Sequence, residues 1–398
     1  MKFSSKVLQC QFSPIRKFYP YTVKAEKQGK KIYYMNIGQP DIKTPPEFFD
    51  AIHNFCDPVL EYAPSAGIPD LIRAVRNYYR NIGVGIKSDD ILITNGGSEA
   101  LLFTMMAILD EGDEVIIPEP YYPSYSTFVA ATGASVVPIP TTAEEGYHYA
   151  DRARIEAKIT PRTRAILITN PGNPTGTVLS LDELRMILDV AIQHQLFVVA
   201  DEVYREFIYN DSPMSSIGIF EDGAEHVVII DSVSKRFSAC GARVGALITR
   251  NRELREHIMK FCQARLSVPT LDQLGAIALY SVGPEYFATV REEYRARRDI
   301  VYQKLQQMEG VVCGEPQGAF YVTCRLPVSD AEQFQIWLLT EFDDNGETLM
   351  FAPAKSFYAT PGKGLSEIRI SYVLNRSALE RSMEILEKAL LAYKAHQE

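Results

Sequence analysis

The middle of the chain alternates short apolar runs with helix-like segments. The helical pattern is clearest over Leu181–His194, which follows Ser180, a residue type that often caps helix N-termini. This alternation predicts a mostly parallel sheet between helices, with ligands bound at the carboxyl ends of the strands. The runs expected to be strands are Asp90–Thr94, Glu114–Pro118, Ser135–Pro140, Ala165–Thr169, Phe197–Ala200, Val227–Ile230 and Ala246–Thr249.

The pattern changes after about Pro284. The long charged stretch Glu285–Met308 predicts a helix, and short β-like runs follow at Ala319–Cys324 and Glu367–Tyr372. A final helix is expected over Ser377–Lys394, because apolar residues recur there with helical spacing. Its apolar face consists of Leu379, Met383, Leu386, Leu390 and Tyr393.

Two domains are expected, because 398 residues exceed the usual size of a single hydrophobic core. With the change of pattern, this predicts an α/β protein. Its large domain, residues 46–284, holds the mostly parallel sheet between helices, and residues 1–45 and 285–398 form a smaller α+β domain.

Charge and cysteine content narrow the function classes. A net charge of −9 argues against nucleic-acid and anionic-membrane partners, which need clustered Lys and Arg. The six cysteines are scattered without a C-x-x-C pair, which indicates reduced thiols and neither a disulfide framework nor a metal site. No signal peptide or membrane-spanning apolar stretch is apparent. We therefore expect a cytoplasmic enzyme.

The segment with the strongest chemical signal begins directly after the run Val227–Ile230. Ser232 and Ser234 precede Lys235, and Arg243 follows between two glycines. A lone lysine on such a loop is usually a solvated cation. Here, hydroxyl groups and a guanidinium can bind a phosphate, and the lysine amine can form a Schiff base with an aldehyde beside it.

Three more polar segments follow apolar runs. Asn173 lies in the turn-rich segment 169–176, where it can donate to a ligand or simply shape the turn. Asp201 ends the run before Tyr204, where it can cap a turn or pair with a protonated pyridine nitrogen. Gly97 and Ser98 start a helix after a strand, a position that suits phosphate.

In this order and spacing, the segments resemble the class I and II aminotransferases, which are pyridoxal 5'-phosphate (PLP) enzymes of fold type I. The resemblance covers almost the whole chain. The segment 36–41 resembles the N-terminal Gly-Pro-Asp element of the family, and Tyr62 with Gly67 resembles its Tyr-Gly-Leu-Arg motif. Arg369 in the segment 368–371 resembles the arginine that binds the substrate carboxylate. The overall pattern is most similar to aspartate aminotransferases.

The resemblance implies catalytic roles. Lys235 would hold PLP as a Schiff base and then move a proton at the substrate α-carbon. Asp201 would keep the pyridine nitrogen protonated, so that the ring accepts electrons. Asn173 and Tyr204 would bind the ring 3-oxygen, and Tyr122 would stack on the ring.

The resemblance also implies how phosphate and substrate are bound. The phosphate would be held by Gly97, Ser98, Ser232 and Arg243, and by Tyr62 of a second subunit, because the family shares its active sites across a homodimer. Arg369 would bind the α-carboxylate of the substrate, and Gly38 and Asn173 would lie beside it.

Several alternatives remain open at this point. A PLP β-lyase on the same fold would use the same cofactor residues. A transcription regulator with an aminotransferase-like domain would need a DNA-binding domain, for which the residues before Gly38 leave no room. A dehydrogenase is disfavoured because no G-x-G-x-x-G follows the first strand.

The substrate needs a second contact besides the α-carboxylate. Arg16, Lys17 and Lys355 are candidate cations for a distal carboxylate, although each one also suits a solvated surface. Ala354 departs from the glycine that the family has before Lys355. We expect aspartate or glutamate as amino donor and 2-oxoglutarate or oxaloacetate as acceptor, with an aromatic or broad-specificity enzyme as the alternative.

Overall fold

The computed structural model describes residues 1–10, 16–210 and 216–397. Of the N-terminal segment with the candidate cations, Arg16 and Lys17 are described, whereas Ser13–Ile15 lie outside the described residues. Within the described ranges, no helix is long and apolar enough to cross a bilayer.

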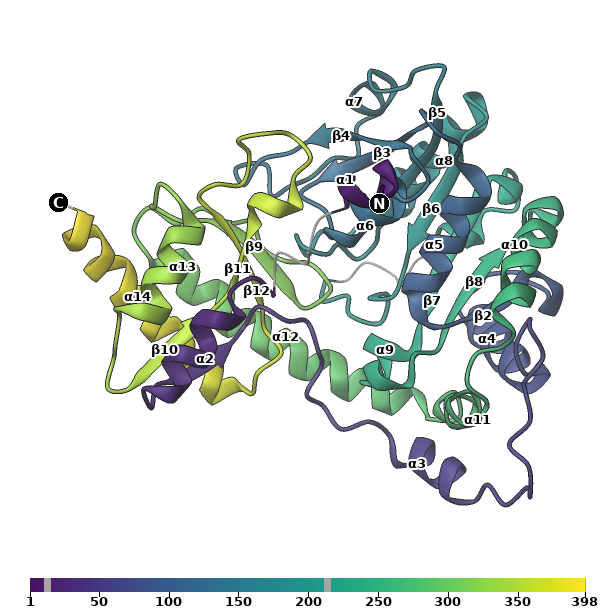
Figure 1. Ribbon diagram of the computed structural model, residues 1–398, viewed down its shortest axis with the longest axis horizontal. Helices are drawn as coiled ribbons and strands as arrows, with labels where there is room; N and C mark the ends of the chain where they lie inside the picture. Colours follow the sequence, from purple (N-terminus) through teal and green to yellow (C-terminus); the bar gives the residue numbers. More distant parts are fainter. Residues whose placement is uncertain (11–15, 211–215, 398) are drawn as a thin grey trace.

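A seven-stranded sheet forms the centre of the larger part of the molecule (Figure 1). Its strand order is β2-β8-β7-β6-β5-β3-β4, and only β8 runs antiparallel to its neighbours. All seven strands expected from the sequence are confirmed, as is the mostly parallel arrangement. Their bounds are β2 (Ile91–Thr94), β3 (Glu114–Glu119), β4 (Ser135–Pro140), β5 (Thr163–Thr169), β6 (Phe197–Asp201), β7 (Val227–Ser232) and β8 (Gly245–Thr249).

Helices cover both faces of this sheet, because successive strand residues point to opposite sides. On β5, Ile166 and Ile168 belong to one apolar core, and Ala165 and Leu167 belong to the other. The first core packs mainly against α4, α8 and α11, and the second against α5, α6 and α10. The helices of the larger part are α3 (Pro46–His53), α4 (Pro69–Asn81), α5 (Gly96–Ile108), α6 (Ser124–Ala130), α7 (Arg152–Glu156), α8 (Leu181–Gln193), α9 (Val233–Arg236), α10 (Arg252–Arg265) and α11 (Thr270–Leu279).

The smaller part combines two small sheets with the chain-terminal helices. The antiparallel sheet has the order β11-β12-β9, and β1 pairs with β10 in parallel. The expected late helices and β-like runs correspond to α12, α14, β9 and β12. The bounds are α2 (Tyr19–Lys27), β1 (Lys31–Tyr34), α12 (Pro284–Gln307), β9 (Tyr321–Arg325), α13 (Ala331–Thr340), β10 (Glu347–Met350), β11 (Ala352–Pro353), β12 (Glu367–Ser371) and α14 (Arg376–Gln397). The first helix, α1 (Ser5–Gln9), packs instead against α6 of the larger part, where the Lys6 Nζ donates to the Thr132 carbonyl at 2.8 Å.

The two parts meet at the segment that follows β6. Tyr204, Phe207 and Tyr209 leave the large sheet and join the apolar core of the smaller part, where the rings of Tyr204 and Phe207 pack edge-on against Phe320. The long helix α12 runs beneath both parts (Figure 1). This packing places the carboxyl ends of β5, β6 and β7 opposite β9 and β12.

Candidate active site

The floor of the candidate site lies where β6 and β7 end. Asp201 is the last residue of β6, and Ser232 ends β7 one residue before the short helix α9, which carries Lys235. Because β6 and β7 are parallel neighbours, their ends lie side by side. Asp201 and Lys235, which were predicted from separate motifs, therefore lie at the same edge of the sheet.

Asp201 is a buried carboxylate that accepts two hydrogen bonds and forms no ion pair with any residue that the structure describes. Its Oδ2 accepts a hydrogen bond from the Tyr125 hydroxyl at 2.6 Å, and its Oδ1 accepts one from the Val203 N–H at 3.3 Å. Burial raises the pKa of Asp201 to about 6, although the Tyr125 hydrogen bond opposes this rise. A cationic ligand atom beside Asp201 would therefore be strongly stabilised.

Lys235 lies half-buried above this floor. Its Nζ donates to the Gly38 carbonyl at 2.7 Å, and the Cys240 Sγ lies 3.9 Å away. Gly38 also has no room for a side chain, because a Cβ there would lie 1.7 Å from the Tyr321 hydroxyl. The N-terminal segment thus holds the lysine amine in place through a backbone atom.

An anion cradle lies at the N-terminus of α5. Gly96 has a φ of +75°, and a Cβ there would lie 2.3 Å from the Arg243 Nη2, so the guanidinium packs directly on the first turn. Gly97 and the exposed Ser98 are the next residues of this turn, whose N–H groups point out of the helix. A guanidinium beside free helix N–H groups suits a phosphate.

Ser232 has a structural role in this cradle. It is buried and caps α9, and its Oγ lies 2.8 Å from the Ser234 Oγ and 3.0 Å from the Val244 carbonyl. The Arg243 Nη1 lies 3.5 Å from the Ser234 Oγ and donates to the Cys240 carbonyl at 3.0 Å. Ser234, which the sequence analysis did not select, thus lies nearer to the guanidinium.

Arg369 on β12 connects the smaller part to Asn173. Its Nη1 donates to the Asn173 Oδ1 at 3.0 Å, and its Nη2 donates to the Asn36 carbonyl at 2.6 Å. The Asn173 Nδ2 in turn lies 3.5 Å from the Tyr204 hydroxyl. Burial raises the pKa of Tyr204 well above its ordinary value, so this hydroxyl stays protonated. The structure therefore brings these three predicted residues together.

Arg369 is a buried cation without a carboxylate partner in the described part of the chain. The residue is 2% exposed and its Nε has no hydrogen-bond partner. Its guanidinium carbon lies 4.5 Å from the Tyr321 ring and 5.1 Å from the Phe357 ring. Because a buried charge is costly unless paired, this arrangement suits an anionic ligand.

Tyr122 and Tyr62 differ in placement. Tyr122 packs edge-on against Tyr125 with ring centroids 5.5 Å apart, so it lies beside the partner of Asp201. Tyr62, in contrast, is 80% exposed and has no hydrogen bond or ring contact with any described residue. The structure of one chain therefore does not bring Tyr62 to the other predicted residues.

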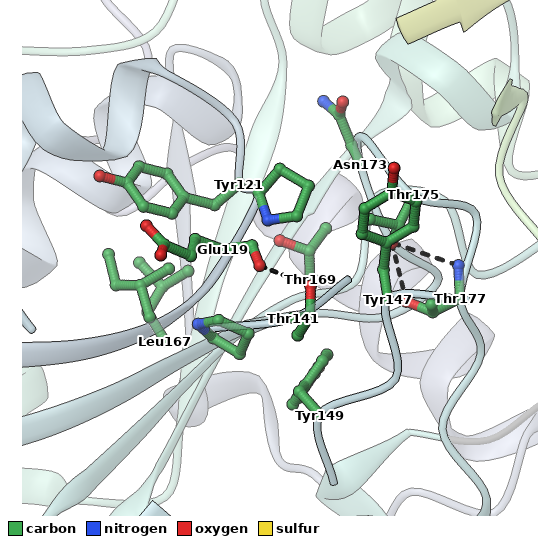
Figure 2. A pocket seen from close by; sticks show the side chains of 14 residues that line it. Glu119, Tyr121, Thr141, Tyr147, Tyr149, Leu167, Thr169, Asn173, Thr175 and Thr177 are labelled. Atoms are coloured by element: carbon green, nitrogen blue, oxygen red, sulfur yellow. Dashed lines mark hydrogen bonds between the residues drawn. The ribbon is translucent and has the colours of Figure 1, made fainter. Parts of the chain in front are cut away.

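Asn173 and Glu119 line a small cavity next to the site (Figure 2). Its volume of about 20 Å³ suits a single water molecule. Glu119 lines it, and the Glu119 Oε2 accepts the N–H groups of Ala359 and Thr360, each at 3.0 Å. The Tyr121 N–H also donates to the Phe357 carbonyl at 2.9 Å. The end of β3 thus anchors the loop that carries Lys355.

Tyr125 and Tyr321 are site residues that the sequence analysis missed. Tyr125 lies on α6, three residues after Tyr122, which directly precedes the cap of this helix. In the antiparallel pair of β12 and β9, Ser371 is opposite Tyr321, so Tyr321 shares a face with Arg369. The helical spacing was a usable signal for Tyr125, whereas Tyr321 required the strand register.

These groups fit PLP. The α5 cradle with Arg243 matches a phosphate, the buried Asp201 matches a protonated pyridine nitrogen, and Lys235 supplies the amine. Arg369, which lacks a carboxylate partner among the described residues, leaves a place for a substrate carboxylate. Fold and site together define a PLP enzyme of fold type I.

Comparison with known proteins identifies the family. The model described as aminotransferase class I and II matches residues 30–386. An aspartate aminotransferase of Pyrococcus horikoshii is 30% identical over 393 residues, 97% of each chain. The chain belongs to the class I and II aminotransferase family and is a PLP-dependent aminotransferase.

Solved structures agree with this assignment. The aspartate aminotransferase from Thermus thermophilus with maleate has a TM-score of 0.89 at 27% identity, over 98% of this chain and 100% of that chain. An alanine aminotransferase from Pyrococcus furiosus also has a TM-score of 0.89, at 28% identity over 98% of this chain and 100% of that chain. The fold is therefore similar to enzymes named for different amino acids.

Proposed function

We propose that the enzyme transfers the amino group of aspartate or glutamate to 2-oxoglutarate or oxaloacetate. The observation that carries the proposal is Arg369, a buried guanidinium without a carboxylate partner within the described residues. Its planar donors suit the α-carboxylate that every such substrate has. The names of the relatives, including the structure with the dicarboxylate maleate, support the dicarboxylic preference.

The residue roles follow from the geometry. When bound, PLP supplies a ring that withdraws electrons from the substrate α-carbon. We assign proton transfer at that carbon to Lys235, and we assign stabilisation of the pyridine N–H to Asp201. Gly97, Ser98, Arg243 and Ser232 or Ser234 would hold the phosphate, with Tyr122 against the ring.

We assign the distal carboxylate of the substrate to Lys355. Lys17 is paired with Glu332, so its charge is already compensated. Lys355 lines the same cavity as Tyr122 and has no ion pair with any described residue. Arg16 is exposed and is not among the residues that line this cavity. Lys355 is exposed as well, but it differs from Arg16 in lining the cavity of the proposed ring-stacking tyrosine, where a second carboxylate can reach it.

The amino-donor preference tests the proposal directly. We expect aspartate or glutamate to exceed phenylalanine in kcat/KM with 2-oxoglutarate as acceptor. The measurement compares the donors in steady-state assays of the holoenzyme. A phenylalanine preference of about tenfold, roughly 1.4 kcal/mol of transition-state binding, would refute the dicarboxylic preference and favour the aromatic alternative.

Lys355→Met should specifically weaken dicarboxylic substrates. Removing the cation leaves the distal carboxylate unpaired, so we expect kcat/KM for aspartate to fall about tenfold or more while alanine changes little. Lys363→Met is a matched control, because Lys363 lines the same cavity on the same loop. Equal losses for both donors, or equal losses in both variants, would contradict the role of Lys355.

We also propose a cytoplasmic homodimer. Tyr62 is exposed, and its place in the family motif supports a role in the active site of a second subunit. Its neighbours Val59 and Leu60 are also exposed. Exposed apolar side chains in a row often mark an interface. A cytoplasmic location is supported by six free cysteines, none of which forms a disulfide.

A further inference from the structure

Tyr321 on β9 touches three groups of the proposed site. Its hydroxyl lies 3.0 Å from the Tyr204 hydroxyl, and both side chains are buried. Its ring lies against the Arg369 guanidinium at 4.5 Å. The same hydroxyl packs so closely on Gly38 that a Cβ at this position would lie 1.7 Å away. Gly38 is therefore required as glycine in order to admit this tyrosine.

Arg369 sets the direction of the hydrogen bonds. A guanidinium only donates, so the atom of Asn173 that faces Arg369 must be the amide oxygen. The Asn173 NH₂ group then faces Tyr204, where it can only donate to the hydroxyl oxygen. This interaction, at 3.5 Å, supplies one donor to that oxygen.

Tyr321 supplies the second donor. Among the described residues, the only hydrogen-bond partner of the Tyr321 hydroxyl is Tyr204, and its other close neighbour, the Gly38 Cα, cannot accept. When Tyr321 donates, both lone pairs of the Tyr204 oxygen are used. The single proton of Tyr204 must then point away from Asn173 and Tyr321, and it remains available to a ligand.

We propose that Tyr321 is a positioning residue that directs the Tyr204 proton toward the 3-oxygen of PLP. The inference rests on the proposed role of Tyr204 as the ligand of that oxygen. Without the Tyr321 hydroxyl, the Tyr204 proton is free to turn toward the vacated side. The 3-oxygen then keeps more negative charge, which holds the proton on the neighbouring Lys235 nitrogen to higher pH.

The test uses Tyr321→Phe, which removes the hydroxyl and keeps the ring against Arg369. In the holoenzyme, we expect the pH midpoint of the visible cofactor band to rise by about 0.5 to 1 unit, the size expected for one weakened hydrogen bond. The KM for the amino donor should change less than kcat, because the ring contact with Arg369 is retained. Tyr372→Phe is the control, since its hydroxyl lies 3.4 Å from the Ala319 carbonyl in the same apolar core.

A double variant separates positioning from a general structural effect. If Tyr321 acts through Tyr204, then Tyr204→Phe/Tyr321→Phe should have the same midpoint as Tyr204→Phe alone. An unchanged midpoint in Tyr321→Phe, additive shifts in the double variant, or an equal shift in Tyr372→Phe would overturn the inference. The midpoint is read without substrate, so a failure of the proposed substrate preference leaves this test intact. A wild-type protein that forms no visible band with PLP would instead refute the cofactor roles proposed for Lys235 and Tyr204.

Discussion

At the scale of single residues, the site contains two buried charges that form no ion pair within the described part of the chain. Asp201 is a buried acid with two hydrogen-bond donors, and Arg369 is a buried base that contacts an amide and a carbonyl. Each of these charges would cost free energy in a protein without a ligand. The cofactor and substrate carry the charges that compensate them, so ligand binding removes a cost that folding has imposed.

Asp201→Asn should therefore stabilise the cofactor-free protein at pH 8. Burial raises the pKa of Asp201 to about 6, so the folded state retains a proton that the unfolded state releases near pH 4. Above pH 6 the ionised Asp201 therefore lowers the free energy of unfolding, by about 3 kcal/mol at most. Urea unfolding should show the variant to be more stable by about 1–3 kcal/mol, with the difference vanishing toward pH 4.

Saturation with PLP should reverse this order, because only the carboxylate carries the negative charge that compensates a protonated pyridine nitrogen. The contrary result would be a cofactor-free Asp201→Asn protein that is less stable than the wild type at pH 8. That result would mean that Tyr125 and Val203 already compensate the carboxylate fully.

Sequence analysis could predict most readily the site residues that lie at the ends of strands. Apolar runs located the ends of β6 and β7, and a parallel sheet necessarily brings such ends together, so Asp201 and Lys235 could be placed side by side. Tyr321 could not be placed, because its contact with Tyr204 spans 117 positions and depends on how β9 docks on the large sheet. The Asn36 carbonyl that binds Arg369 is a backbone atom, for which no side-chain pattern exists.

At the scale of elements, a buried ionic network connects α9 to β7 and to the segment after β6. Asp231 near the end of β7 pairs with Arg236 of α9, and Arg205 pairs with Glu202 and lies 3.5 Å from the Asp231 Oδ2. All four side chains are buried. Buried ion pairs seldom add net stability. We interpret the network as a device that fixes Lys235 and Asp201, which are sequence neighbours of Arg236 and Glu202.

Asp231→Asn should destabilise the protein by about 3–5 kcal/mol at pH 7, because two buried guanidinium groups lose their shared carboxylate. Burial alone would raise the pKa of Asp231, but Arg236 and Arg205 more than offset this and lower it. The stabilisation is thus present above about pH 4 and is lost as the pH falls through the lowered pKa. Urea unfolding at several pH values measures both effects.

Asp222→Asn is the matched control for this network. Asp222 pairs with Arg185 at 2.7 Å on the surface and is largely exposed, so its loss should cost far less stability than the loss of Asp231. Similar losses in Asp222→Asn and Asp231→Asn would show that burial of the network has no special effect.

At the scale of the whole molecule, the proposed homodimer would bring Tyr62 of a second subunit to the site. In one chain this side chain lies on the surface, and the neighbouring carbonyl of Glu61 accepts a hydrogen bond from Thr270 Oγ1 at 2.8 Å. The backbone next to Tyr62 is thus fixed at the start of α11, while the Tyr62 side chain itself stays exposed. This placement suits a residue that serves a second subunit.

Mixed dimers should test this sharing. Lys235→Ala should abolish transamination, and Tyr62→Ala should reduce it strongly. A heterodimer of the two carries one site with both wild-type residues, so random exchange should restore about a quarter of the wild-type activity. Activity is measured after the inactive variants have been refolded together. No recovery, despite heterodimers in native mass spectra, would place Tyr62 outside the shared site.

The hydrogen bond between Arg369 and Asn36 spans 333 positions and has a consequence for biosynthesis. During translation, β6, which ends at Asp201, and α9, which carries Lys235, leave the ribosome well before β12, and domains generally fold as units in order of synthesis. A nascent chain can thus acquire its cofactor while the clamp for amino acids does not yet exist. Turnover requires β12, which leaves the ribosome nearly last, so cofactor binding need not wait for the arginine that binds the amino acid.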